Sequence, residues 1–274
     1  MIREKKIYCG DFLEVDLIPY TETPGKRNKK RKRAKKKKLS PPKQRNLNDK
    51  NARRYFIQLI NANFGSGDYK VEATYNSDNH PETIEEAERE IDNFFTRVNY
   101  KRKKKGLKPA RRVCINESSV YSDTGKLKHM HHHIYLEGGL SRDEVESCWS
   151  RPKKKGQAVG DRIGRINANW LQPDENGLAG IAMYTTKDTK AGKKKWSSSH
   201  NLIKPEQAPP VDGRYSKRQV EKIARGEVDI AYINKKYPGW KITDMNYGIR
   251  IEYNEHTNHY YIYLRLRRER KGPT

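Results

Sequence analysis

Two segments of alternating residues, on either side of a six-residue turn sequence, place the strongest constraint on the fold. RRVCINE (111–117) and KHMHHHIYLEG (128–138) follow the period-two pattern of β-strands. YSDTGK (121–126) lies between them and contains the Asp, Thr and Gly residues that favour a tight turn. The sequence therefore predicts an antiparallel hairpin. If the turn centres near Thr124, paired residue numbers sum to about 248, which places Glu117 opposite His131.

The second strand of this hairpin holds four of the chain's eight histidines. Alternate side chains of a strand point to opposite faces, so His129, His131 and His133 share one face and His132 points to the other. Two imidazoles and a carboxylate, with coordination positions left open, form a recurrent site for a divalent cation. We therefore predict that His131, His133 and Glu117 bind Mn²⁺ or Mg²⁺, with His129 as an alternative ligand if the register slips. Without Glu117, such histidines are typical of a solvated outer face.

The remaining patterns predict an α+β fold. They indicate helices over 46–64, 81–105, 141–149, 173–184, 216–226 and 228–237, strands over 69–76 and 159–170, and a hairpin over 247–267. Residues 1–20 alternate weakly, which fits a short strand or irregular structure. This order is typical of an antiparallel sheet with flanking helices. We expect a basic N-terminal arm and linker (1–44), a main domain (45–204) and a small C-terminal α+β accessory unit (205–274).

The charge balance predicts a polyanionic partner. The chain has 59 Lys and Arg residues against 34 Asp and Glu, a formal charge of +25. KRNKKRKRAKKKK (26–38) supplies eleven of the positive charges, and the rest of the chain still carries +14 (25 less 11). Such charge favours nucleic acid through counterion release. In this arm, Lys29, Lys30, Arg31 and Arg33 are among the candidate DNA-binding residues, although a basic tail can also serve solubility alone.

Cysteine and hydropathy patterns predict a cytoplasmic protein. Cys9, Cys114 and Cys148 are odd in number and form no CxxC pair, as expected for reduced thiols. No segment approaches the roughly 18 apolar residues of a membrane span. The first residues also lack the apolar stretch of a signal peptide, so we expect no membrane partner.

The histidine strand and a later tyrosine motif together resemble a known superfamily. HHH (131–133) runs into IYLEGG, and YTTK (184–187) follows on a predicted helix. This arrangement resembles the HUH endonucleases, in particular the rolling-circle replication-associated (Rep) proteins of phages and plasmids of Gram-positive bacteria. The family's first motif corresponds to EATYNS (72–77), and the resemblance spans about residues 45–204. The middle residue of the family's His-x-His motif is a bulky apolar one, whereas here it is His132.

This resemblance implies a fold and an activity. The fold would be the RRM- or ferredoxin-like palm of HUH enzymes. The activity would be metal-dependent, site-specific nicking of single-stranded DNA at a replication origin in a bacterial host cell. Tyr184 would attack the phosphodiester, form a 5′-phosphotyrosine link and free a 3′-OH. Lys187, one helical turn further, would stabilise the phenolate or contact the phosphate. No GxxxxGK[ST] motif occurs, so unwinding would need a host helicase or supercoiling.

Two further groups of residues are candidates for DNA contacts. Residues that combine phosphate-binding charge with a stacking ring are Lys193, Lys194, Lys195 and Trp196. In the C-terminal unit, an arginine-rich edge with Arg265, Arg267 and Arg268 is a candidate for origin recognition. An exposed basic loop, with Trp196 in a local core, is an equally good interpretation of the first group.

Two other functions compete with the nickase. A single-tyrosine transposase would use the same chemistry, but those enzymes are shorter and lack so long a basic arm and C-terminal unit. A non-enzymatic basic nucleic-acid-binding protein would need neither the histidines nor Tyr184. A nicking assay with and without Mn²⁺ separates the enzymatic from the non-enzymatic alternative.

Overall fold

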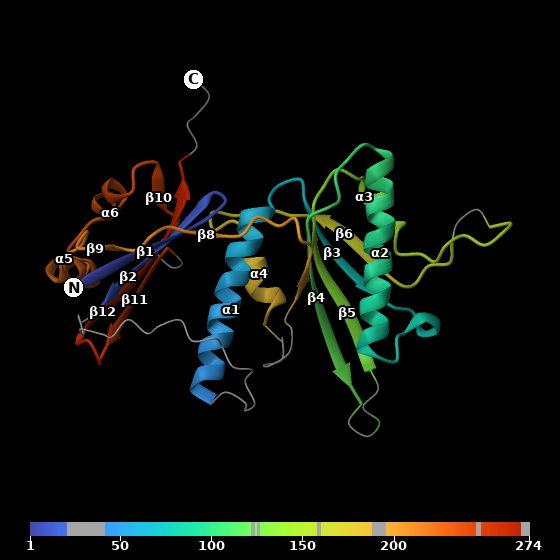
Figure 1. The fold of residues 1–274 in the computed structure, drawn as a ribbon, viewed down its shortest axis with the longest axis horizontal. Coiled ribbons are helices and arrows are strands. Elements are labelled where there is room, and N and C mark those ends of the chain that lie inside the picture. The colour runs from blue at the N-terminus through green and yellow to red at the C-terminus, as the bar shows by residue number, and fades with distance from the viewer. Residues whose placement is uncertain are drawn as a thin grey trace, which may run out of the picture. The chain divides into compact units, whose positions relative to one another are not determined.

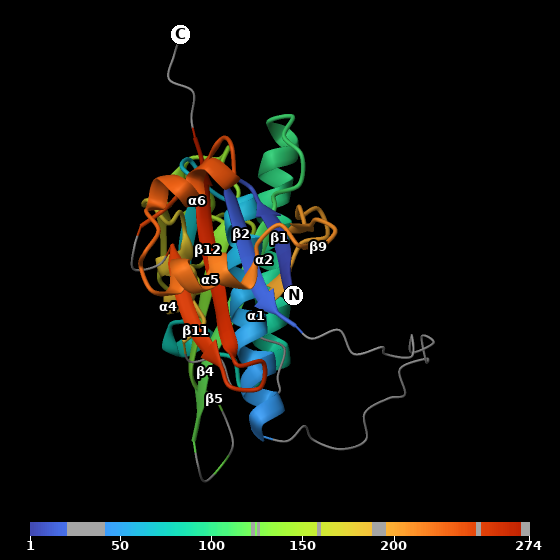
Figure 2. The ribbon, with the colours of Figure 1, turned by 90° about the vertical axis from the view of Figure 1, so that its left-hand side faces the viewer.

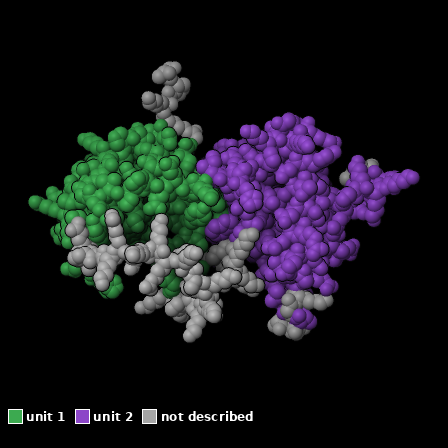
Figure 3. Space-filling view, in the orientation of Figure 1, with its two compact units in different colours: residues 1–62, 174–176, 204–274 green, residues 63–173, 177–203 purple. Residues whose placement is uncertain are grey.

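The chain is an α+β protein with two antiparallel sheets. The computed structural model describes residues 1–20, 42–121, 124, 127–157, 160–187, 196–244 and 248–269. Contacts divide it into two compact units, unit 1 (residues 1–62, 174–176 and 204–274) and unit 2 (residues 63–173 and 177–203) (Figure 3). The basic arm 26–38, with Lys29, Lys30, Arg31 and Arg33, lies outside the described residues, as do Lys193, Lys194 and Lys195.

Unit 1 is built on a sheet in which the two ends of the chain pair with each other. Its strands are β1 (Ile2–Cys9), β2 (Phe12–Pro19), β8 (Glu206–Gln207), β9 (Val211–Asp212), β10 (Trp240–Ile242), β11 (Ile249–Asn254) and β12 (His259–Arg268). Its helices are α1 (Pro42–Asn63), α5 (Lys217–Ala224) and α6 (Ile230–Lys236). β12 pairs with β2, with Leu264 opposite Val15, and α5 and α6 cover one face of the sheet (Figure 2). The core there is formed by aliphatic residues from both ends of the chain, together with Tyr215 and Tyr237.

The turn between β1 and β2 requires glycine. Gly10 has φ +66°, and a Cβ atom there would lie 2.5 Å from the Asn61 carbonyl oxygen of α1. Any other residue at this position would therefore both strain the backbone and push the helix away from the hairpin.

Buried ion pairs hold α1 against the other face of this sheet. The Arg54 guanidinium donates to Glu14 at 2.8 Å and to Asp16 at 2.9 Å, and Gln58 donates to Glu14 at 2.7 Å. Arg265 is 3% exposed and also donates to Glu14, at 3.0 Å. The prediction that Arg265 lies on a DNA-binding edge is wrong, because β12 is an interior strand and this side chain points into the helix–sheet layer.

The units differ from the expected domains. Residues 1–20 form two complete strands in the same sheet as the C-terminal residues, and helix α1 belongs with them. The boundary expected at residue 204 coincides with a change of unit, because unit 1 resumes at Lys204. The boundary expected at residue 44 instead falls inside α1, and the N-terminal and C-terminal segments belong to one unit. Pairing between distant strands produces this grouping, and local patterns carry no signal for it.

Unit 2 contains the histidine hairpin in a five-stranded sheet of order β6-β3-β5-β4-β7. Its strands are β3 (Tyr69–Thr74), β4 (Arg112–Val120), β5 (Leu127–Leu136), β6 (Ile166–Trp170) and β7 (Ser197–Ser198). Its helices are η1 (Ser77–Asn79), α2 (Ile84–Lys104), α3 (Arg142–Glu146) and α4 (Ala179–Thr185). Helices α2 and α4 lie on opposite sides of the sheet (Figure 1). Phe94 and Phe95 of α2 pack with Val71 and Ile134 in the core.

Local signals account for the helix ends in this unit. Thr83 caps α2 by accepting from the Glu86 amide, and the predicted capping box of Ser141 and Glu144 is present at α3. The helix expected from residue 173 instead begins at Ala179. Residues 174–176 belong to unit 1 and lie outside the helix. The strand expected over 159–170 is likewise shorter, Ile166–Trp170.

Two further expectations concern the thiols and the membrane. The three cysteines are buried and free, as expected. Among the helices of the described segments, none combines the length and the apolar character needed to cross a bilayer.

Candidate metal and tyrosine site

The histidine strand β5 is the central strand of the sheet in unit 2, and its register is the predicted one. Glu117 of β4 lies directly opposite His131. On the other side of β5, Thr74 lies opposite His131 and Glu72 lies opposite His133. The prediction of Glu117 as the neighbour of His131 is confirmed. It followed from the turn position alone.

Alternation along β5 separates the histidines as expected. His132 points to the face covered by α2, together with Ile134 and Met130, and is fully buried. We call the opposite face the site face and define it by Lys70, Glu72, Glu117, His131 and His133. Strand alternation and the register place these five side chains on one side of three adjacent strands.

His133 is held between two carboxylates. Its Nε2 lies 2.9 Å from Glu117 Oε2, and its Nδ1 lies 3.5 Å from Glu72 Oε1. The imidazole is 13% exposed, whereas Glu117 and Glu72 are about half exposed at 53% and 43%. His131 is exposed across from Glu117, and His129 is exposed across from Ser119, further toward the turn. His133 is thus the most enclosed of the site-face histidines.

The spacing between two of these donors is compatible with a shared divalent cation. Two ligand atoms that each lie about 2.1 Å from a cation, at a right angle, are roughly 3.0 Å apart, close to the spacing of His133 Nε2 and Glu117 Oε2. Directly opposed residues have Cβ atoms roughly 5 Å apart, so the His131 ring can reach the same position. Within the described residues, no group of three or more His, Cys, Asp or Glu side chains converges as a ready ligand set. His131 would therefore have to turn toward Glu117 when the cation binds.

Sequence reasoning missed two members of the site face, Glu72 and Lys70. Lys70 Nζ lies 2.7 Å from Glu72 Oε1, and this hydrogen bond lowers the pKa of the Glu72 carboxyl. The same ammonium lies 5.9 Å from the centroid of the Tyr184 ring. Both residues stand in the strand that was predicted over 69–76. Only its pairing with β5, which the sequence does not reveal, brings them to the histidines.

Tyr184 lies on the short helix α4, which is fixed to the sheet by its neighbour. Thr185 is buried, and its hydroxyl lies 3.0 Å from the hydroxyl of Tyr135, which is two residues from His133 on β5. Tyr184 itself is 69% exposed. Lys187 is exposed just beyond the helix, and its backbone N–H donates to the Tyr184 carbonyl at 3.1 Å. The structure thus presents an accessible phenol beside Lys70 on the sheet that carries the histidines.

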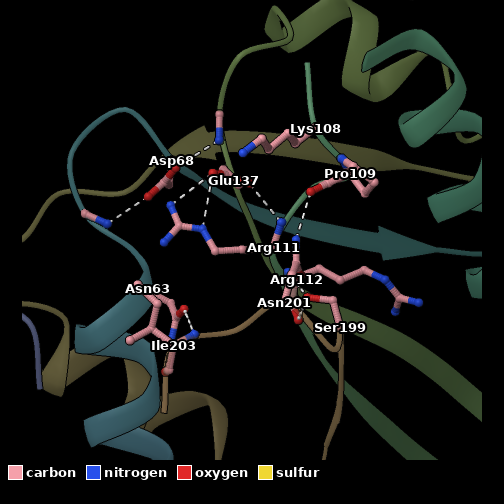
Figure 4. Close-up of polar contacts among 12 residues, drawn as sticks. Asn63, Asp68, Lys108, Pro109, Arg111, Arg112, Glu137, Ser199, Asn201 and Ile203 are labelled. Atoms are coloured by element: carbon pink, nitrogen blue, oxygen red, sulfur yellow. Dashed lines mark hydrogen bonds and ion pairs between the residues drawn. The ribbon is translucent and has the colours of Figure 1, made fainter. Parts of the chain in front are cut away.

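The segment after Trp196 returns to this sheet. The Ser199 N–H donates to the Arg112 carbonyl and Arg112 N–H donates to Ser199 Oγ, both at 3.0 Å (Figure 4). Asn63 and Ile203 exchange two further hydrogen bonds, at 2.7 and 2.8 Å. Trp196, one of the predicted DNA contacts, is half-buried at the start of this segment. The chain is therefore anchored to the sheet shortly before and shortly after the predicted basic loop.

The burial and hydrogen bonds of His132 indicate that this residue has a structural role. Its Nε2 lies 2.7 Å from the Tyr75 hydroxyl and its Nδ1 lies 2.8 Å from Asn116 Oδ1. Burial lowers the pKa of His132 to about 3, so the ring is neutral. A neutral ring can donate from Nδ1 to the Asn116 oxygen and accept from Tyr75 at Nε2. This explains how a polar ring is accommodated in the interior at this position of β5.

We expect His132→Ala to destabilise the fold by about 3 kcal/mol, since it leaves a cavity and removes the hydrogen bonds of the ring to Tyr75 and Asn116. Chemical denaturation monitored by circular dichroism measures this. His129→Ala, on the same strand but exposed, is the matched control and should change stability by less than about 0.5 kcal/mol. Equal unfolding midpoints for the two variants would contradict the structural role of His132.

Comparison with other proteins assigns neither a family nor a function to this chain. No protein-family model matches this chain, and neither the curated proteins nor the solved structures include a significant match. The functional interpretation therefore depends on the site face and Tyr184.

Proposed function

We propose that the protein is a single-tyrosine, metal-dependent DNA nickase of the HUH type that initiates rolling-circle replication. One observation carries the proposal. In one sheet, the His133 ring is hydrogen-bonded to Glu117 and His131 lies opposite Glu117. In the same sheet, Lys70 lies beside the ring of the exposed Tyr184. An antiparallel sheet flanked by α2 and α4 is compatible with the RRM- or ferredoxin-like palm of that superfamily.

His131, His133 and Glu117 would hold Mn²⁺ or Mg²⁺. Imidazole donors favour Mn²⁺ over Mg²⁺, and the carboxylate suits both. When bound, the cation would neutralise charge on the non-bridging oxygens of the scissile phosphate. Glu72, hydrogen-bonded to Lys70, adds a carboxylate beside His133 that can hold this ring in place.

The protein's own residues would supply the nucleophile and the positive charge around it. The Tyr184 hydroxyl loses its proton to solvent, and the phenolate oxygen bonds to phosphorus as the bond from phosphorus to the 3′ oxygen breaks. The released 3′ oxygen takes up a proton and becomes a 3′-OH, while the 5′ side stays linked to Tyr184. The ammonium groups of Lys70 and Lys187 would stabilise negative charge on the phenolate and phosphate. The covalent link conserves the energy of the phosphodiester, so strands can be rejoined without ATP.

The test is nicking of supercoiled DNA. A supercoiled plasmid that carries the DNA encoding and flanking this protein should be converted to the open circular form with Mn²⁺ and should stay supercoiled with EDTA. Agarose electrophoresis resolves the two forms. Binding without any conversion would favour the non-enzymatic nucleic-acid-binding alternative.

A further prediction concerns the basic arm. Deleting residues 26–38 removes eleven positive charges. The slope of log affinity against log salt should become shallower, by about 0.7 for each phosphate of single-stranded DNA that the shortened protein no longer neutralises. Fluorescence anisotropy over a salt series measures the slope. Cleavage of a saturating oligonucleotide should be unchanged, since the arm acts on affinity. An equally steep slope after deletion would show that the arm does not bind DNA.

A further inference from the structure

One tryptophan of unit 2 has an unusual environment. Trp170, at the end of the edge strand β6, is 54% exposed, whereas Trp149 of the same unit is fully buried. The Trp170 ring stacks on Tyr69, with centroids 4.1 Å apart and an interplanar angle of 24°. Tyr69 is fully buried, and its hydroxyl donates to the Leu140 carbonyl at 3.0 Å. The buried tyrosine thus fixes a flat indole whose remaining surface faces solvent.

The neighbours of Trp170 suit a nucleotide. Arg165, which directly precedes the strand, is exposed. Arg142 donates to Asn167 Oδ1 at 2.7 Å, and its side chain is 53% exposed. A stacking ring with cationic groups nearby is the combination by which proteins bind single-stranded nucleic acid.

The register places Trp170 at the edge of the sheet, on the face opposite to the site face. Trp170 pairs with Tyr69, and Asn169 pairs with Lys70. Lys70 is the residue whose ammonium lies 5.9 Å from the centroid of the Tyr184 ring. Because adjacent residues of a strand point to opposite faces, a DNA strand with a phosphate at Tyr184 would pass around the edge strand β6 to reach the Trp170 ring.

We propose that Trp170 is a stacking platform for one nucleobase of single-stranded DNA, with Arg142 and Arg165 near the flanking phosphates. That the bound DNA strand is the one cut by Tyr184 rests on the proposed function. Base stacking on Trp170 does not depend on the proposed function, and it can be measured without cleavage.

Two 20-mers separate stacking from charge. One is oligo(dT), and the other has the same sugar–phosphate backbone without bases. Binding is measured by anisotropy in EDTA, so that no metal-dependent cleavage occurs. Trp170→Ala should weaken binding of oligo(dT) about tenfold and leave binding of the base-free strand unchanged. The salt dependence should be the same for both proteins, because no charge is removed.

Conservative and matched variants complete the test. Trp170→Phe should recover most of the affinity for oligo(dT) and should still fold if Trp170→Ala does not. Tyr100→Ala removes another exposed aromatic ring, 60% exposed on α2, and should bind both strands as the unaltered protein does. Equal weakening on both strands, or no weakening on either, would overturn the proposal. Failure of plasmid nicking would instead reject the proposed function and leave this result intact.

Discussion

Tyr184→Phe should abolish the covalent protein–DNA adduct, lowering its rate of formation by on the order of a thousandfold or more. The substitution removes the oxygen that would bond to phosphorus and keeps the ring beside Lys70. Because Tyr184 is 69% exposed, the loss of its hydroxyl should leave folding and DNA binding unchanged. The measurement is denaturing electrophoresis after incubation with Mn²⁺ and a labelled oligonucleotide that the unaltered protein cuts.

The control is another exposed tyrosine of unit 2. Tyr100→Phe alters a phenol that is 60% exposed on α2 and is not part of the site face, and it should form the adduct at the normal rate. An undiminished adduct with Tyr184→Phe would transfer the nucleophile to another of the 17 tyrosines. Cleavage by the unaltered protein without any adduct would indicate a water nucleophile and reject the tyrosine mechanism.

The local parts of this structure could be predicted from the sequence because local signals determine them. The turn sequence and the alternation on both sides of it set the register of β4 and β5, which is why Glu117 was placed opposite His131 correctly. The caps at Thr83 and Ser141 depend on residues only three positions apart. Each of these features needs only a short stretch of chain.

The features that were missed depend on pairing between distant segments. Glu72 and Lys70 reach the site face because β3 pairs with β5, some 60 residues later in the chain. Arg265 had the sequence context of an exposed basic edge, but pairing of β12 with β2 buries it against Glu14. Periodicity shows that a strand has two faces. It does not show which other strand, or which helix, each face will meet.

The same distinction applies to the histidines. Alternation alone separated His132 from His131 and His133, and the structure buries it as that pattern requires. Its hydrogen-bond partner Tyr75 comes from the residue that follows β3. The sequence thus indicated which histidine packs inward, and the structure adds how a polar ring is accommodated there.

The second large effect is expected at the metal ligands. His133→Ala should weaken Mn²⁺ binding by on the order of a hundredfold and abolish Mn²⁺-dependent nicking, because His133 is the most enclosed donor and lies 2.9 Å from Glu117. His131→Ala should have a similar effect, since its ring would complete the ligand set. Isothermal titration with Mn²⁺ measures binding directly and does not depend on DNA cleavage.

His129→Ala is the matched control for these variants, because His129 lies on the same strand and the same face but across from Ser119. It should bind Mn²⁺ and cut DNA normally. Full activity of a His131→Ala/His133→Ala double variant would reject this site. An inactive His129→Ala together with an active His133→Ala would instead move the ligand pair two residues along β5, to His129 and His131. Glu117, which lies opposite His131, would be next to the cation in either case, so Glu117→Gln should weaken Mn²⁺ binding whichever pair of histidines holds it.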